Sequence, residues 1–289
     1  MLSIRIEKHI TVECTGSTVI GMLSEHCDTI SNKKLKLALQ YGAVWLTSGS
    51  TTNRIRRAKK LLSPGEELHL YYDDAILFNE VKAATLVADE GDYSVWSKPC
   101  GMYSQGTKWG DHSAICRWVE LQGLSMNDLP QRSTFLVHRL DRATQGLILV
   151  AHHKKMASML AGLFEQRQIQ KQYRAKISGE LPKHLMGTTL SEALDGRTAK
   201  TRILKSVFNA ERNESTLTLL LETGRKHQIR KHLAGIGKPI IGDRLYGSGG
   251  EVGEASVLPD LQLVSCLLSF ICPVTHEKKC YQLPETITE

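Results

Sequence analysis

The chain has 289 residues, of which 41% are hydrophobic and 23% are charged, a balance typical of a folded globular protein and not of a disordered or fibrous one. This length corresponds to about two domains of ~150 residues each. Lys and Arg exceed Asp and Glu by 37 to 30, and the resulting net charge of +7 indicates a polyanionic partner only where the basic residues cluster.

Membrane and secretory segments are not expected. Apolar runs such as residues 147–151 are far shorter than the ~20 residues of a membrane helix. The first 14 residues alternate between polar and apolar side chains and lack the apolar stretch of a secretory leader. The seven cysteines include no C-x-x-C pair, which argues against a disulfide framework and a zinc site. We therefore expect a cytoplasmic protein with no membrane partner and no bound metal.

The N-terminal quarter predicts a small module. Residues 30–42 predict a helix that Ser31 or Asn32 caps and that Gly42 ends. A strand follows at 43–47, a turn at Ser63 to Glu66 and a further strand at 68–72. We expect one domain over residues 1–75 and a second over residues 76–289.

Basic residues gather in this module, with no acidic residue between positions 33 and 60. A solvated helix face is the alternative for a single charge run, but two clusters on one small unit favour an RNA-binding face. The two clusters comprise Lys33, Lys34, Lys36, Arg54, Arg56, Arg57, Lys59 and Lys60. Of these we take Lys33, Lys34, Lys36, Arg56 and Arg57 as the RNA-binding residues.

The remaining chain mixes strands with a few helices. Asp111 is expected to cap a helix that carries Ile115, Trp118 and Val119. Helices are also predicted around 156–164 and 226–234, and a hairpin turn at 195–196. Strands are predicted at 85–88, 93–96, 135–137, 147–151, 173–177, 217–221, 267–271 and 281–283. The fold class is therefore α+β, with a mixed, mainly antiparallel sheet and flanking helices, plus the small N-terminal α/β domain.

Three polar segments adjoin predicted strands and carry the candidate chemistry: 138–146, 171–175 and 224–232. In the first, Asp141 stands between Arg139 and Arg142, and a cationic neighbour keeps a carboxylate ionised by lowering its pKa. An ordinary loop carboxylate held in salt bridges is the alternative. The chain contains no Walker A, G-x-G-x-x-G, H-E-x-x-H or G-x-S-x-G motif, so cofactor-free chemistry is what remains.

Taken together, these segments resemble the RluA-type family of RNA pseudouridine synthases. Residues 138–146 match its H-R-L-D-x-x-T-x-G loop, Lys171 and Tyr173 match its K-x-Y motif, and 224–232 match its G-R-x-H-Q-I-R-x-H motif. Lys98, Pro99 and Gly101 match the opening K-P-x-G, and 237–247 match the segment that follows the arginine helix. The N-terminal module is similar, more loosely, to a small RNA-binding module of ribosomal proteins that many members carry.

The resemblance implies a role for each matched residue. Asp141 is the catalytic aspartate, as nucleophile or as base; Arg230 pairs with it, and Tyr173 packs on the uracil and assists proton removal from carbon 5. Arg139 fills the gap left by a flipped nucleotide or binds phosphate. The remaining substrate-binding residues are Lys98, Lys226, Ile229 and Lys231, the lysines serving the RNA backbone.

The implied function is isomerisation of specific uridines in ribosomal or transfer RNA by a monomer without a cofactor. The alternative is a non-catalytic RNA-binding or ribosome-assembly factor that kept the fold. A nucleoside hydrolase is disfavoured because the three segments hold a single carboxylate, whereas glycosidases use two. The chain departs from the family at Gln145, where serine is usual, and at 263–265 and Leu267.

Overall fold

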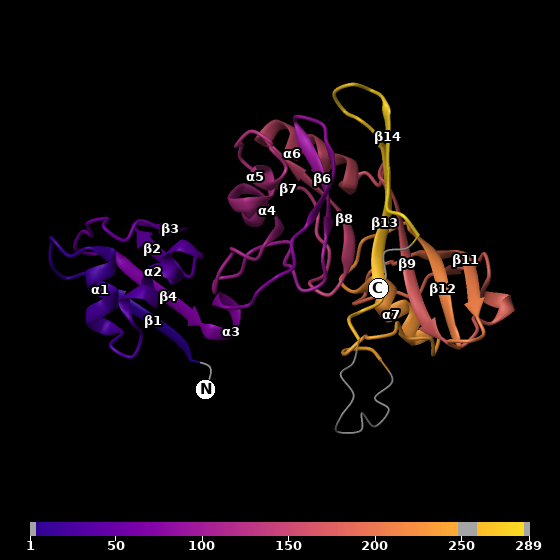
Figure 1. Ribbon diagram of the computed structural model, residues 1–289, viewed down its shortest axis with the longest axis horizontal. Coiled ribbons are helices and arrows are strands. Elements are labelled where there is room, and N and C mark those ends of the chain that lie inside the picture. The colour runs from indigo at the N-terminus through magenta and orange to yellow at the C-terminus, as the bar shows by residue number, and fades with distance from the viewer. Residues whose placement is uncertain (1–3, 248–258, 286–289) are drawn as a thin grey trace. The chain divides into compact units, whose positions relative to one another are not determined.

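The computed structural model describes residues 4–247 and 259–285 and divides the chain into two compact units (Figure 1). Unit 1 comprises Met1–Val81 and Gln105–Trp118, and unit 2 comprises Lys82–Ser104 and Val119–Glu289. The domain boundary expected at residue 75 stays a prediction. The return of residues 105–118 to the first unit had no signal in the sequence.

Unit 1 is built on a four-stranded antiparallel sheet in the order β1-β4-β2-β3. Leu68, Leu70 and Tyr72 of the central strand β4 are fully buried in one apolar core with residues of α1 and α2. The intervening side chains of each strand point to the opposite face of the sheet. The elements of the unit are β1 (Arg5–Thr11), α1 (Val19–His26), α2 (Asn32–Gln40), β2 (Val44–Ser48), β3 (Thr51–Arg54), β4 (Glu67–Asp73), α3 (Asp74–Leu77) and α4 (Ile115–Trp118).

Helix α2 forms for the reasons expected from its sequence. The Ser31 hydroxyl caps it by accepting a hydrogen bond from the Lys34 backbone N–H at 3.4 Å. Gly42 follows the helix with a φ of +76°, a conformation that suits glycine. Lys33 and Lys36 are exposed, whereas the Lys34 ammonium pairs with Asp74 at 3.3 Å.

Asp111 does not cap a helix, because its carboxylate binds two arginines of unit 1 instead. Oδ2 accepts from Arg54 Nη1 at 3.1 Å and from Arg56 Nη2 at 2.5 Å, and Arg56 Nη1 donates to the Gln40 carbonyl at 2.8 Å. Arg56 thus has a structural role in unit 1, and its expected contact with RNA stays a prediction. Arg57 remains exposed.

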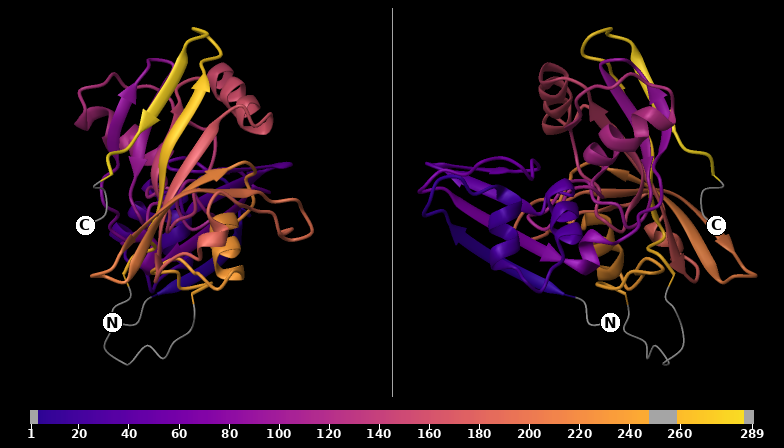
Figure 2. Two further views of the ribbon diagram at one scale, coloured as in Figure 1. Left: turned by 90° about the vertical axis from the view of Figure 1, so that its right-hand side faces the viewer. Right: turned by 60° about the vertical axis from the view of Figure 1, so that its left-hand side comes forward.

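Unit 2 contains a ten-stranded sheet, mixed and mainly antiparallel as predicted, in which β13 pairs with β8 as the parallel neighbour (Figure 2). Along its main path the order is β10-β11-β12-β9-β13-β8-β6-β5, with β14 on β13 and β7 on β8. Its strands are β5 (Thr85–Asp89), β6 (Tyr93–Lys98), β7 (Phe135–Leu136), β8 (Gln145–Ala151), β9 (Gln170–Ser178), β10 (Thr189–Leu190), β11 (Thr201–Asn209), β12 (Glu214–Leu221), β13 (Leu263–Ile271) and β14 (Lys278–Gln282).

Two helices of unit 2 position the site. Helix α6 (Lys154–Glu165) buries Met156 and Leu160 in one core cluster with Leu147 and Leu149 of β8, and α7 (Gln228–Gly235) lies against β11. The unit also contains a π-helix at Val119–Gly123, α5 (Leu124–Met126) and a short 3₁₀ turn at Lys183–Leu185. Among the described residues, none of the helices has the length and apolarity that crossing a membrane would need.

Candidate active site

The loop between β7 and β8 presents Asp141 and is held from both sides by the segment that follows β6. The Gly101 N–H donates to the Arg142 carbonyl at 2.9 Å, and Arg142 Nε donates back to the Gly101 carbonyl at 3.2 Å. The Ser104 hydroxyl donates to the Leu140 carbonyl at 2.7 Å and accepts from the Leu140 N–H at 2.9 Å. Both neighbours of Asp141 are thus fixed to one segment, which pre-orders the carboxylate.

Lys98 belongs to this clamp and not to an RNA-binding surface. Its side chain is fully buried, and its ammonium donates to the carbonyls of Met102 at 2.9 Å, Pro99 at 3.1 Å and Arg142 at 3.4 Å. Burial lowers the pKa of Lys98 to about 8, against the opposing effect of Cys100 and Asp141. The predicted contact with the RNA backbone is therefore corrected: Lys98 orders the Asp141 loop.

Helix α7 is fastened to the sheet by polar side chains of its own motif. Gln228 accepts from the Thr223 hydroxyl at 2.8 Å and donates from Nε2 to the Thr201 hydroxyl at 2.9 Å. His232, one turn further on, also contacts Thr201, with 2.9 Å between Nδ1 and Oγ1. These contacts orient the first turn of α7, and with it Ile229 and Arg230, toward the Asp141 loop.

Arg230 reaches Asp141, but its main partner is Asp243. The guanidinium donates from Nε and Nη2 to the two Asp243 carboxylate oxygens at 2.8 and 2.7 Å, and its Nη1 lies 3.7 Å from Asp141 Oδ2. The bidentate hydrogen bonds to Asp243 raise the pKa of Arg230. Burial alone would raise the pKa of Asp243, but hydrogen bonds from Arg230 and from two backbone N–H groups lower it. Arg230 is thus a fixed cation aimed at Asp141.

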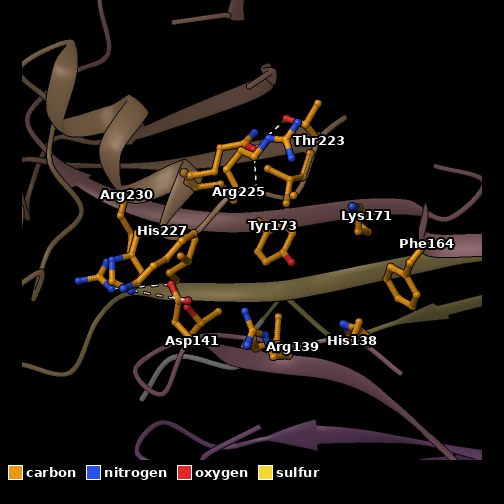
Figure 3. A pocket seen from close by; sticks show the side chains of 18 of the residues that line it. His138, Arg139, Asp141, Phe164, Lys171, Tyr173, Thr223, Arg225, His227 and Arg230 are labelled. Atoms are coloured by element: carbon orange, nitrogen blue, oxygen red, sulfur yellow. Dashed lines mark hydrogen bonds and ion pairs between the residues drawn. The ribbon is translucent and has the colours of Figure 1, made fainter. Parts of the chain in front are cut away.

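His227 is the second side chain that faces the Asp141 carboxylate, as Figure 3 shows. Its Nε2 lies 3.8 Å from Asp141 Oδ1, and its Nδ1 is 2.9 Å from the Tyr246 hydroxyl. The backbone of His227 has a φ of +55°, a left-handed conformation that non-glycine residues adopt at a cost. Burial lowers the pKa of His227, while Asp141 acts to raise it.

Tyr173 stands between Asp141 and the far end of the site in the same view (Figure 3). It lies on β9 opposite Ser265 of β13 and is 7% exposed. Burial raises the pKa of Tyr173 to about 12. Its hydroxyl therefore keeps its proton at neutral pH, and its ring offers an apolar surface beside the carboxylate.

These residues line one cavity of about 480 Å³, a size typical of small-ligand sites. Of the predicted site residues, the cavity gathers Asp141, Tyr173, Arg230, Arg139, Lys226 and Ile229. Lys231 is not among its lining residues, because its ammonium binds Asp195 at 2.9 Å. Figure 3 shows Phe164, Lys171 and His138 at the end of the cavity away from Asp141, and Glu165 and Arg167 also line the cavity.

The segment that contains Asp243 and Tyr246 matches a family motif, but the sequence indicated no role for either residue. It indicated no role for His227 either. Asp243 lies 13 positions after Arg230, a distance for which helical spacing predicts no contact. The motif match at 237–247 was the available signal, since a buried arginine needs an acidic partner.

The chain is similar in sequence to known proteins. Residues 92–235 match the family model described as RNA pseudouridylate synthase. The chain is 31% identical over 197 residues to the dual-specificity RNA pseudouridine synthase RluA of Vibrio parahaemolyticus, covering 62% of this chain and 74% of that protein. It is 33% identical over 164 residues to the RNA pseudouridine synthase YjbO of Bacillus subtilis, covering 52% and 54%. The chain thus spans about half the length of YjbO.

The fold has solved counterparts. Human RNA pseudouridylate synthase domain containing 4 superposes with a TM-score of 0.55 at 21% identity, over 69% of this chain and 88% of that chain. At this identity the likeness speaks for the fold alone.

Proposed function

Because this chain belongs to the RluA-type family of RNA pseudouridine synthases, we propose that it isomerises uridine to pseudouridine in RNA. The reaction breaks the bond from uracil N1 to the ribose C1′, joins C1′ to carbon 5, and moves the hydrogen of carbon 5 to solvent while N1 gains one. Water is not consumed. The observation that carries the proposal is a loop carboxylate, Asp141, held in a cavity beside a fixed guanidinium and a buried tyrosine.

Asp141 is proposed as the catalytic residue. Its side chain is 30% exposed, so it can meet a substrate, and Arg230 and His227 approach opposite oxygens at 3.7 and 3.8 Å. The Arg230 guanidinium places a positive charge beside this carboxylate, and nucleophilic chemistry uses a carboxylate as an anion. Neither contact is a full hydrogen bond, which leaves lone pairs of Asp141 available for the nucleoside.

Tyr173 is proposed to carry the uracil ring. Its flat apolar face is suited to stacking on a base. Since its pKa is about 12, its hydroxyl acts as a hydrogen-bond donor to the bound base, and any role in removing the carbon 5 proton requires an acceptor beside it. A hydrolytic function is less well supported: the second carboxylate on the cavity, Glu165, is exposed and adjoins Phe164, which Figure 3 shows away from Asp141.

The test is release of tritium to water from RNA labelled at carbon 5 of uridine. Wild-type protein is expected to release it, and Asp141→Asn to lose at least ~10²- to 10⁴-fold in rate while binding the same RNA. Asp195→Asn, which removes a carboxylate that is 69% exposed, is the matched control. Full activity of Asp141→Asn would contradict the assignment. RNA binding without tritium release by the wild type would favour the non-catalytic alternative.

We propose ribosomal or transfer RNA as the substrate and a cytoplasmic monomer as the active form. The exposed Lys33, Lys36 and Arg57 of unit 1 support RNA binding through phosphate contacts. Mapping of pseudouridines in RNA from a strain that lacks the protein would identify the positions: sites missing in that strain and restored by the wild type, but not by Asp141→Asn, are its targets.

A further inference from the structure

The outer face of the unit 1 sheet carries two histidines and a glutamate that converge. His9 on β1 pairs in register with His69 on β4, and Glu67 stands two residues before His69 on the same face. One possible ligand atom from each residue lies within 4.8 Å of the other two. The three belong to unit 1 and are separate from the Asp141 cavity.

The two rings face each other through the same nitrogen. His9 Nδ1 and His69 Nδ1 are 2.7 Å apart. On the far side of each ring, His69 Nε2 is 2.7 Å from the Thr47 hydroxyl and His9 Nε2 is 3.6 Å from the Glu7 carboxylate. Thr47 Oγ1 can accept the Nε2 hydrogen of His69 while donating to Thr52, 2.7 Å away. In the tautomers that carry their hydrogen on Nε2, the Nδ1 lone pairs of both rings are directed at one point.

Two imidazole nitrogens at this distance hold between them either one hydrogen, as an N–H···N hydrogen bond, or a metal ion. A hydrogen bond needs only the two nitrogens. Here a carboxylate also lies close, because Glu67 Oε2 is 3.9 Å from His69 Nε2 and one ligand atom of each residue lies within 4.8 Å of the other two. The Thr47 hydroxyl holds the His69 ring as outer acceptors hold metal-bound histidines.

We propose that His9, His69 and Glu67 form a zinc-binding site. Two imidazoles and one carboxylate match the donors that Zn²⁺ takes at ~2.0–2.2 Å, which places the donors roughly 3.3–3.6 Å apart in a tetrahedron. The side chains of His9 and Glu67 are 45% and 44% exposed, so both can move to bring their donor atoms to this spacing. A water molecule would complete the fourth position. The proposal is independent of the isomerase function. Sequence spacing could not indicate it, because the two histidines lie 60 positions apart.

The test is a calorimetric titration of Zn²⁺ into the full chain, with any affinity tag removed and the protein stripped with a chelator. One equivalent is expected to bind, with loss of binding in His9→Ala and His69→Ala, weaker binding in Glu67→Gln and about a 10-fold weaker affinity in Thr47→Ala. His184→Ala, an exposed histidine of unit 2, is the control and should bind as the wild type does.

His69 is 8% exposed, so His69→Ala could unfold the protein. The decisive variant is therefore His9→Ala, because the His9 side chain is exposed. Zn²⁺ should raise the melting temperature of the wild type and leave that of His9→Ala unchanged. An absence of saturable binding would overturn the proposal and leave a hydrogen bond between the two rings. One equivalent retained in both His9→Ala and Glu67→Gln would overturn it too, and would place the bound ion at another site, such as a cysteine.

Discussion

Arg139 is an exposed residue of the predicted site: it lines the cavity and belongs to the same loop as Asp141. A uridine in a duplex must leave the stack to reach a recessed carboxylate, at a cost of a few kcal/mol, and a planar guanidinium can stack in its place. An arginine that binds phosphate would instead raise the rate of conversion equally for structured and unstructured RNA. The choice between these two roles can be tested with substrates that differ only in structure.

We predict that Arg139→Ala slows conversion of a uridine in a stem by ~10-fold or more, and conversion of the same uridine in an unstructured oligonucleotide much less. Tritium release from the two labelled RNAs measures this ratio. Lys226→Ala, which removes another cation of the cavity wall, should lower both rates by a similar factor. Equal losses for both RNAs in Arg139→Ala would assign Arg139 to phosphate binding.

His138 illustrates a residue whose chemistry the sequence could not predict. Its ring stacks on Phe164 with centroids 4.3 Å apart, and its Nε2 accepts the Leu149 N–H at 3.0 Å. Burial, followed by the charge of Lys171, lowers the pKa of His138 to about 3. The ring is therefore a neutral acceptor that joins the loop to β8, a role that its place in the motif does not indicate.

A pH dependence of stability follows. The unfolded chain protonates this histidine below pH ~6.5, whereas the folded chain does so only near pH 3, so stability is lost as the pH falls through this window. Between pH 7 and pH 5 the wild type should lose up to ~2 kcal/mol more than His138→Gln, which keeps an acceptor without titrating. Urea unfolding at both pH values measures the difference. Parallel losses would show that His138 does not carry this linkage.

At the scale of elements, prediction succeeded where local pattern decides. The turn at Asp195 and Gly196 has φ values of +51° and +72°, as an Asp-Gly hairpin requires, and α6 follows its apolar spacing. Strand β1 and helix α1 were missed. The sequence also could not show that Gln145 and Gly146 of β8 pair in parallel with β13, because residues more than a hundred positions apart form that pair.

Gly146 makes this parallel pair possible. It has a φ of +108°, and a Cβ there would collide with the backbone of Ser265 on β13. Gly146→Ala is therefore expected to lower the free energy of unfolding by about 2 kcal/mol or more and to reduce activity, since the Asp141 loop leads directly into this part of β8. Gly162→Ala in α6, where a Cβ meets nothing within 4 Å, should stabilise the protein by ~0.5–1 kcal/mol. Thermal unfolding of the two variants should thus shift in opposite directions.

At the scale of the whole molecule, the chain passes between its units three times, after Val81, Ser104 and Trp118. The sequence indicated two domains joined once, because nothing local marks residues 105–118 as part of the first. Their place depends on long-range contacts within unit 1: Asp111 with Arg54 and Arg56, and the Trp45 indole N–H donating to the Lys108 carbonyl at 3.0 Å. Two residues of the predicted basic clusters, Arg54 and Arg56, take part in this packing through their ion pairs with Asp111.

Asp111 is the residue on which that packing most depends. Its carboxylate is 16% exposed and forms ion pairs with the side chains of Arg54 and Arg56, which are 17% and 29% exposed. Asp111→Ala would therefore leave two poorly solvated cations without a carboxylate partner. With allowance for their partial exposure, we expect a loss of about 2 kcal/mol confined to unit 1. Scanning calorimetry should show the transition of unit 1 at a lower temperature and that of unit 2 unchanged, with Asp195→Asn as a surface ion-pair control. An unshifted transition in Asp111→Ala would mean that residues 105–118 are held by their aromatic contacts instead.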